Sequence, residues 1–211
     1  MTTFSLHPVK QITTAEGGVV TTDDERLAAK LKLFRNHGIT TDARQRESTG
    51  SWFYEMTTLG FNYRLSDLQC ALGSAQLQRL DKWVARRREI AARYASAFAG
   101  ERALELPTVR SDRESAWHLY VLRLHLDQLK IGRSEFVDQL KQRGVGTSVH
   151  FIPLHMHPYY RDTYHYCHES FPVALREYYR SFSLPIYPGM SPDQVAYVIE
   201  QVSEVVKQGR R

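Results

Sequence analysis

The sequence predicts an α/β segment over residues 1–99, followed by a small α+β domain over residues 100–211. Short β-branched segments and one long helical pattern occupy the first part. Gly100 and Pro107 then interrupt regular structure, and strand and helix patterns alternate after them. An apolar fraction of 42% in 211 residues is enough to bury a core.

Composition limits the classes of protein to consider. No run of about 18 apolar residues occurs, so we expect no membrane-spanning helix and no membrane partner. The first residues lack the basic and apolar regions of a signal peptide, which predicts a cytoplasmic location. Cys70 and Cys167 form no disulfide framework and fit a reducing compartment. The net charge of +5 suits an anionic ligand or a nucleic acid without proving either.

Two predicted strands, residues 4–6 and 18–22, flank a loop of Pro, Thr and Gly that contains Lys10. Pro8 stiffens the approach to Lys10, and Gly17-Gly18 allows a close backbone turn. A stiff loop rather than a helix surface therefore holds this amine. Most loop lysines are simply solvated, so the loop alone assigns no function.

Helix signals follow in order. A capping box at residues 22–25 predicts a helix that ends at Gly38. A second capping box, formed by Ser66 and Gln69, opens a long helical pattern that reaches Phe98 with an expected bend at residues 81–83.

One side of this long helix is basic. The side is made of the cationic residues Lys82, Arg86, Arg87, Arg88 and Arg93. A nucleic-acid interface would need aromatic interleaving or a known motif, and neither accompanies it. We therefore interpret it as a solvated helix face and expect no nucleic-acid partner.

The second part is predicted as strand, helix, strand, helix and helix. The expected elements are a strand at 117–124, a helix capped by Ser134 and ended by Gly144, a strand at 145–152, a helix at 172–182, an extended piece at 183–186 and a last helix after Ser191. Ser191 followed by proline is a favourable helix start.

Five histidines and one cysteine lie between residues 150 and 168. They are His150, His155, His157, His165, His168 and Cys167. Imidazole and thiolate are natural zinc ligands, but these spacings fit none of the usual zinc patterns. We therefore predict no metal site.

The lysine loop carries a long motif. Residues 5–18 read Ser-Leu-His-Pro-Val-Lys-Gln-Ile-Thr-Thr-Ala-Glu-Gly-Gly. This resembles Ser-Phe-His-x-x-Lys-x-Ile-Thr-Thr-Gly-Glu-Gly-Gly of the DegT/DnrJ/EryC1/StrS sugar aminotransferases. The family lysine forms a Schiff base with pyridoxal 5'-phosphate, which implies this role for Lys10 and a phosphate contact for Ser5. Leu6 and Ala15 are mild departures from the motif.

Two further segments resemble the same family. Residues 60–67, Gly-Phe-Asn-Tyr-Arg-Leu-Ser-Asp, match its second signature, in which the asparagine reaches the cofactor phosphate of the neighbouring subunit. Asn62 is thereby implied to bind cofactor across a homodimer interface. The segment around His150 and His155 resembles Val-His-Tyr-x-Pro-x-His, which implies that both line the nucleotide-sugar pocket.

The resemblance implies the C-terminal part of a fold-type-I enzyme dependent on pyridoxal phosphate. Its reaction would move an amino group from glutamate to a nucleotide-linked 4-keto sugar for polysaccharide or glycan biosynthesis. Pseudaminic-acid-type enzymes that use UDP-4-keto sugars are the nearest in motif. Related sugar dehydratases carry histidine at the lysine position, so Lys10 favours transamination.

The resemblance covers only the C-terminal portion of the family, whose complete members are nearly twice as long. The helix N-terminus that cradles the phosphate, the stacking aromatic residue and the aspartate at the pyridine nitrogen are not in this sequence. We expect a truncated or split enzyme, whose N-terminal half another chain could supply, with activity of this chain alone left open. The alternative is an inactive dimerisation or interaction domain.

Overall fold

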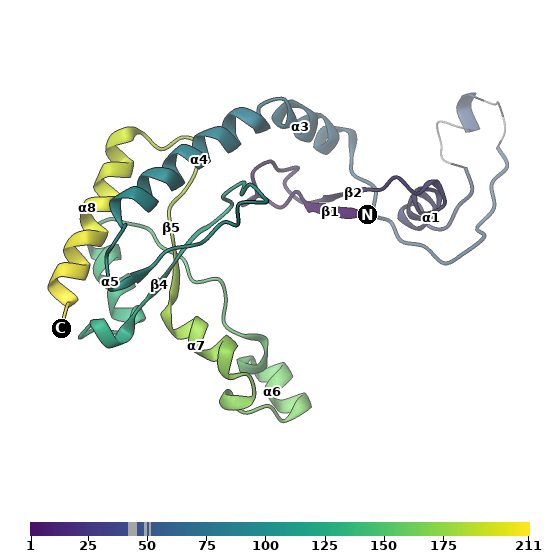
Figure 1. Ribbon diagram of the computed structural model, residues 1–211. Helices are drawn as coiled ribbons and strands as arrows, with labels where there is room; N and C mark the ends of the chain where they lie inside the picture. Colours follow the sequence, from purple (N-terminus) through teal and green to yellow (C-terminus); the bar gives the residue numbers. More distant parts are fainter. Residues whose placement is uncertain (42–45, 49, 51) are drawn as a thin grey trace. The chain divides into compact units, whose positions relative to one another are not determined.

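A computed structural model describes residues 1–41, 46–48, 50 and 52–211 (Figure 1). The polar loop expected around residues 40–51 lies largely outside them. The chain forms two compact units, Met1–Leu80 and Asp81–Arg211, each described by itself below. The first unit ends earlier than the part that the sequence predicts.

The first unit begins with a two-stranded antiparallel ribbon. Strands β1 (Thr2–Ser5) and β2 (Gly18–Thr21) pair from Thr2 opposite Thr21 to Ser5 opposite Gly18. Helix α1 (Glu25–Arg35) follows, and helix α3 (Asp67–Leu77) ends the unit. Both predicted strands are present, and the lysine loop is the connection between them.

The ends of α1 differ in how well the sequence predicts them. Asp24, not Thr22, caps the start, because its carboxylate accepts the N–H groups of Arg26 and Leu27. At the other end the Gly38 N–H donates to the Leu33 carbonyl at 2.9 Å, which confirms the predicted stop.

The predicted long helix is two helices. Helix α3 begins at the predicted capping box of Ser66 and Gln69, and α4 (Leu80–Ala97) begins after a break at residues 78–79. At the break the Arg79 N–H bonds to the Gln76 carbonyl, a tighter turn than the α-helical one. The interruption therefore comes earlier than the bend expected at 81–83.

The second unit is built on a three-stranded antiparallel sheet in the order β3-β4-β5. Its strands are β3 (Leu104–Glu105), β4 (Tyr120–Leu124) and β5 (Ser181–Leu184). Alternate residues of β4 are fully buried, as the predicted period of two requires. They join one core with residues of α4, α5 (Arg133–Gln142) and α8 (Pro192–Gly209), including Ile90, Tyr94, Phe136, Leu140, Val195 and Val202.

Shorter helices complete this unit. They are η1 (Leu126–Gln128), η2 (Leu154–Met156), α6 (Pro158–Tyr164), η3 (His168–Ser170) and α7 (Pro172–Arg180). Figure 1 labels α6 and α7. Ser191 caps α8 in a capping box with Gln194, as predicted.

Three local predictions for this unit are wrong. Gly132 rather than Ser134 occupies the cap position of α5. Residues 145–152 form no strand, and only Ser148 pairs, in a single bridge with Ser183. Strand β4 starts at Tyr120 rather than 117, because Trp117 has a φ of +48° and leaves the extended conformation.

The basic side of α4 is only in part a solvated face, since Lys82 and Arg88 are exposed whereas Arg87 is buried. Arg87 is 6% exposed, and its Nη1 donates to the carbonyls of Trp117, His118 and Ile186. Its burial lowers the pKa of the guanidinium. Arg86, Arg88 and Arg93 likewise donate to the carbonyls of Met190, Ser115 and Pro192. These arginines serve the fold of the unit, which removes the main argument for a nucleic-acid face.

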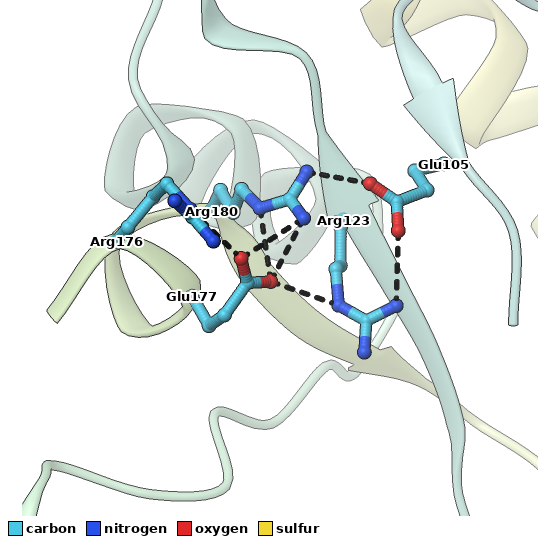
Figure 2. Close-up of polar contacts among 5 residues, drawn as sticks. All are labelled: Glu105, Arg123, Arg176, Glu177 and Arg180. Carbon is cyan, nitrogen blue, oxygen red and sulfur yellow. Dashed lines mark hydrogen bonds and ion pairs between the residues drawn. The ribbon is translucent and has the colours of Figure 1, made fainter. Parts of the chain in front are cut away.

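A charged network joins the sheet to α7 (Figure 2). Arg180 donates to Glu105 at 2.7 Å and to both oxygens of Glu177 at 3.0 Å. Arg123 of β4 pairs with the same two carboxylates at 3.3 and 3.0 Å, and Arg176 adds a contact to Glu177 at 3.1 Å. The network holds strands β3 and β4 and helix α7 together.

No helix in the described part of the chain is long and apolar enough to cross a membrane. Over the same ranges, with their gaps, no three His, Cys, Asp or Glu side chains gather in a way that could hold a metal ion.

Replacing Arg87 by methionine is expected to destabilise the second unit by about 1–3 kcal/mol, because buried carbonyls lose their donor. Urea unfolding of the full chain measures the change. Lys82→Met, on an exposed position of the same helix, is the matched control and should stay within about 0.5 kcal/mol of wild type. Equal effects of the two substitutions would contradict the structural role of Arg87.

Acid should weaken the network of Figure 2. Burial raises the pKa of Glu177, but hydrogen bonds from Arg180 and Arg176 outweigh burial and bring it below its ordinary value of 4.5. A lowered folded-state pKa gives stability that is present above the ordinary pKa and is lost as the pH falls through the folded value. Between about pH 5 and 3, Glu177→Gln should therefore flatten the fall in unfolding free energy. An unchanged acid slope would contradict this.

Candidate active site

Lys10 lies at the end of a tight turn. Its N–H donates to the His7 carbonyl at 3.0 Å, and Pro8 occupies the second position, where its fixed φ favours such turns. Lys10 is half-buried, and its amine contacts no hydrogen-bond partner among the residues that the structure describes. The backbone of this lysine is therefore fixed while its amine stays available.

Hydrogen bonds close the base of the lysine loop. The Leu6 N–H donates to the Gly17 carbonyl at 2.9 Å, and the Leu6 carbonyl accepts the Thr14 N–H at 3.0 Å. The Thr13 hydroxyl donates to the same carbonyl at 2.8 Å. Leu6, only 6% exposed, thus joins both arms of the loop.

Two glutamines of α3 hold the loop from outside. Gln76 accepts the Thr13 N–H at 3.1 Å and donates to the Thr13 carbonyl at 3.2 Å, as a neighbouring strand would. Gln69 donates to the carbonyls of Thr14 and Glu16 at 3.3 and 3.0 Å. Since seven residues are two helical turns, both glutamines lie on one face of α3.

Close backbone approach explains two glycines at this contact. A Cβ on Gly73 of α3 would lie 2.9 Å from Thr14 Cγ2, so the helix presents a gap where Thr14 packs. A Cβ on Gly17 would lie 2.6 Å from Thr14 Oγ1 and 2.7 Å from a Leu65 methyl. Thr14 is 1% exposed and fills this space. We name Gln69, Gly73 and Gln76 the α3 stripe.

Ala15 has a φ of +67°. This left-handed conformation favours glycine, which is the usual residue at the matching place of the family motif. The departure at Ala15 therefore carries a conformational cost, which the surrounding contacts offset.

Ser5 ends β1, at the start of the lysine loop, and is exposed. Its Oγ accepts the His7 N–H at 3.4 Å, which leaves the hydroxyl proton free to point toward a ligand. Ser5 and Lys10 together offer a hydroxyl donor and an amine on one stiff loop. This donor set fits the phosphate and the aldehyde of pyridoxal phosphate.

Asn62 lies before α3 and beside the end of α1. It forms a bridge with Asn36, while the Phe61 carbonyl accepts the His37 N–H at 2.9 Å. The Asn62 side chain is exposed and makes no hydrogen bond to any residue within the described ranges. Its backbone is thus fixed by α1 and its amide is available.

The two predicted substrate histidines differ in their surroundings. His150 is exposed, with Nδ1 3.0 Å from the Ser183 hydroxyl. His155 is 6% exposed, with Nε2 3.1 Å from the His168 carbonyl and its ring 5.0 Å from that of Phe171. Because its ring is committed to neighbouring groups, His155 is well placed to hold η3 in position.

The first unit also contains an open hollow of about 1430 Å³, lined mainly by residues of β1, β2 and α1 and by Phe61, Tyr63 and Leu65. Lys10, Ser5 and Asn62 are not among its lining residues. Exposed apolar side chains, among them Phe4 and Val19, form much of its wall. Such an exposed apolar surface is typical of an interaction site.

The model of the DegT/DnrJ/EryC1/StrS aminotransferase family matches residues 1–203. The chain belongs to this family. An uncharacterized protein of Methanocaldococcus jannaschii is 46% identical over 210 residues, which are 99% of this chain and 54% of the relative. The spore coat polysaccharide biosynthesis protein SpsC of Bacillus subtilis is 47% identical over 208 residues, 98% of this chain and 54% of that protein.

Solved structures of aminotransferases are similar to this chain as well. PseC of Helicobacter pylori, an aminotransferase involved in pseudoaminic acid biosynthesis, has a TM-score of 0.85 at 28% identity, over 98% of this chain and 53% of its own. Spr1654 of Streptococcus pneumoniae, solved in a PLP-form, has a TM-score of 0.83 at 29% identity, over 98% of this chain and 51% of its own. The predicted fold class is confirmed, and the chain spans about half the length of the family members that it matches.

The role of the α3 stripe does not follow from the capping and family motifs. The capping box accounts for only one role of Gln69, because its Nε2 also bonds the lysine loop. The spacing of Gln69, Gly73 and Gln76 was a usable signal, because three such residues share one helix face. A polar stripe facing the loop of this aminotransferase-family chain could have been predicted from it.

Gln76→Ala is expected to loosen the lysine loop, because it removes both hydrogen bonds to the Thr13 backbone. Hydrogen exchange of the Thr13 amide in the full chain should accelerate by roughly 10- to 100-fold. Gln78→Ala is the matched control. Gln78 is the exposed residue at the C-terminal cap of α3, two positions after Gln76, and its side chain bonds to no loop residue that the structure describes. Equal protection of Thr13 in both variants would contradict the clamp.

Proposed function

We propose that this chain is the lysine-bearing part of a pyridoxal-phosphate-dependent aminotransferase that acts on a nucleotide-linked 4-keto sugar. The observation that carries the proposal is the placement of Lys10 on a rigid loop that the α3 stripe holds through four hydrogen bonds. An arbitrary surface lysine needs no such support.

The residues present fit the cofactor. Lys10 supplies the amine that would hold it, and Ser5 supplies a hydroxyl donor for its phosphate. By the family resemblance, Asn62 would supply an amide donor to the cofactor phosphate of a neighbouring subunit. When bound, pyridoxal phosphate provides the electron sink of amino transfer. Lys10 Nζ is then the group that takes and returns a proton near the reacting carbon.

The sugar class is supported by the relatives. SpsC is named for spore coat polysaccharide biosynthesis, and PseC for pseudoaminic acid biosynthesis. Glutamate as amino donor, a UDP-linked 4-keto sugar as acceptor and a homodimer as the working assembly follow from the family resemblance. The position of His150 at an exposed end of its loop supports contact with the substrate, and His155 is proposed to support that loop. The cytoplasmic location stays a prediction.

The ribbon of the first unit points to a further polypeptide. Val19 and Val20 are neighbours on β2, so they face opposite sides of the ribbon, and they are 42% and 43% exposed. Among the described residues of Met1–Leu80, Leu6 is the one buried apolar side chain. Exposed apolar side chains on both faces of a strand indicate surfaces that another part of a protein covers. We propose that the half of the family fold absent from this sequence covers them.

The same exposed surface also supports the second candidate, a non-catalytic domain that associates through it. In that case Lys10 would have no special affinity for the cofactor. The two candidates therefore predict different reactivity of the Lys10 amine toward pyridoxal phosphate.

Reductive labelling tests the proposal. The full chain is mixed with pyridoxal phosphate and reduced with borohydride, alone and together with the portion of Bacillus subtilis SpsC that this chain does not match. Mass spectrometry should find the label on Lys10 at several times the level of other lysines, most strongly in the mixture. Labelling spread evenly over all lysines in both samples would favour the non-catalytic domain.

Lys10→Ala is expected to abolish this selective labelling and, in the mixture, amino transfer to a keto sugar. Lys30→Ala, which removes an exposed amine from α1, is the matched control and should retain both. Full amino transfer by the Lys10→Ala mixture would overturn the proposal.

A further inference from the structure

Ser183 of β5 carries a buried hydroxyl group between two apolar residues of the core. It is 4% exposed and is flanked by the core residues Phe182 and Leu184. Its backbone N–H donates to the Ser148 carbonyl at 2.7 Å, and its carbonyl accepts the Ser148 N–H at 3.2 Å. The backbone of Ser183 is thus fully engaged, and only its Oγ remains for another role.

That Oγ faces one histidine. It lies 3.0 Å from His150 Nδ1 and bonds to no other group in the part of the chain that the structure describes. A buried hydroxyl proton needs an acceptor. If Nδ1 of His150 carried a proton and donated it to Oγ, the hydroxyl proton of Ser183 would have no acceptor. The arrangement in which Oγ–H donates to an unprotonated Nδ1 satisfies both groups.

This donor direction determines the tautomer of His150. A neutral imidazole with an unprotonated Nδ1 carries its proton on Nε2, so Nε2 is a hydrogen-bond donor. His150 is exposed, and the Phe151 ring meets it edge-on at 4.8 Å between centroids. One side of the imidazole is therefore anchored in the fold, and the other side is open to a ligand.

We infer that Ser183 is a positioning residue that fixes His150 with Nε2–H directed outward, as a donor for an anionic phosphate oxygen of the nucleotide sugar. The inference rests on the proposed function, since it names the substrate group that His150 contacts. An N–H donor suits phosphate oxygens, which only accept hydrogen bonds. His155 cannot serve in this way, because its Nε2 already lies 3.1 Å from the His168 carbonyl.

Nitrogen-15 NMR of the histidine rings tests the positioning in the full chain, at a pH where His150 is neutral. Wild type should show His150 with an unprotonated Nδ1 and a protonated Nε2. Ser183→Ala should lower the ratio of this tautomer to the other by roughly fivefold, and Ser183→Thr, which keeps the hydroxyl, should restore it. Ser148→Ala is the matched control, because it removes a hydroxyl from the same bridge without touching His150. A dominant Nδ1–H form in wild type, or equal ratios in all variants, would overturn the positioning role.

The phosphate contact is tested with uridine diphosphate. Titration should shift the His150 Nε2 signal, whereas uridine without phosphate should not, and Ser183→Ala should weaken the apparent affinity by roughly fivefold. Absence of a shift with uridine diphosphate would overturn the phosphate contact. These outcomes are separable from failure of the proposed function, because selective labelling of Lys10 does not involve His150 or Ser183.

Discussion

The contact between the lysine loop and the α3 stripe is the interaction on which the candidate site depends. Side-chain amides of Gln69 and Gln76 supply the partners that a neighbouring strand would otherwise give to the loop backbone. Each such bond contributes about 0.5–1.5 kcal/mol net, so the set is comparable to a short strand pairing. The contact also joins the two family motifs physically, because α3 starts at the end of the second motif and holds the first.

In the second unit, arginine side chains donate hydrogen bonds to backbone carbonyls in a comparable way. Loops around Trp117 and Ile186 leave carbonyls near the core, and Arg87 satisfies them from α4. The two sides of β4 then differ, since alternate residues enter the apolar core while Arg123 joins the ion-pair network of Figure 2. Burial on one side and paired charge on the other hold the small sheet in place, which gives the histidine segment a firm base.

Much of the fold could be predicted because its signals are local. The capping box at Ser66, the helix cap at Ser191, the stop at Gly38 and the alternation in β4 each depend on a few neighbouring residues, and the structure confirms them. Tertiary contacts decided the rest. Nothing near Arg87 in sequence indicates that its side chain is buried and bonds to carbonyls of distant residues. The β-branched run at 145–152 predicts a strand, although only Ser148 pairs.

For the site, the motif resemblance predicted Lys10, Ser5 and Asn62. The glutamines that hold the loop could not be predicted in this way, because they lie more than 50 positions away in sequence from the groups they bind.

The φ of +67° at Ala15 makes the shape of the lysine loop dependent on its contacts with α3. A side chain in this conformation costs about 1–2 kcal/mol, so an undocked loop would spend most of its time in other shapes. The two glutamines and the gap at Gly73 favour the shape that the loop has in the structure. The presentation of Lys10 therefore depends on a helix whose side chains make no contact with the lysine amine itself.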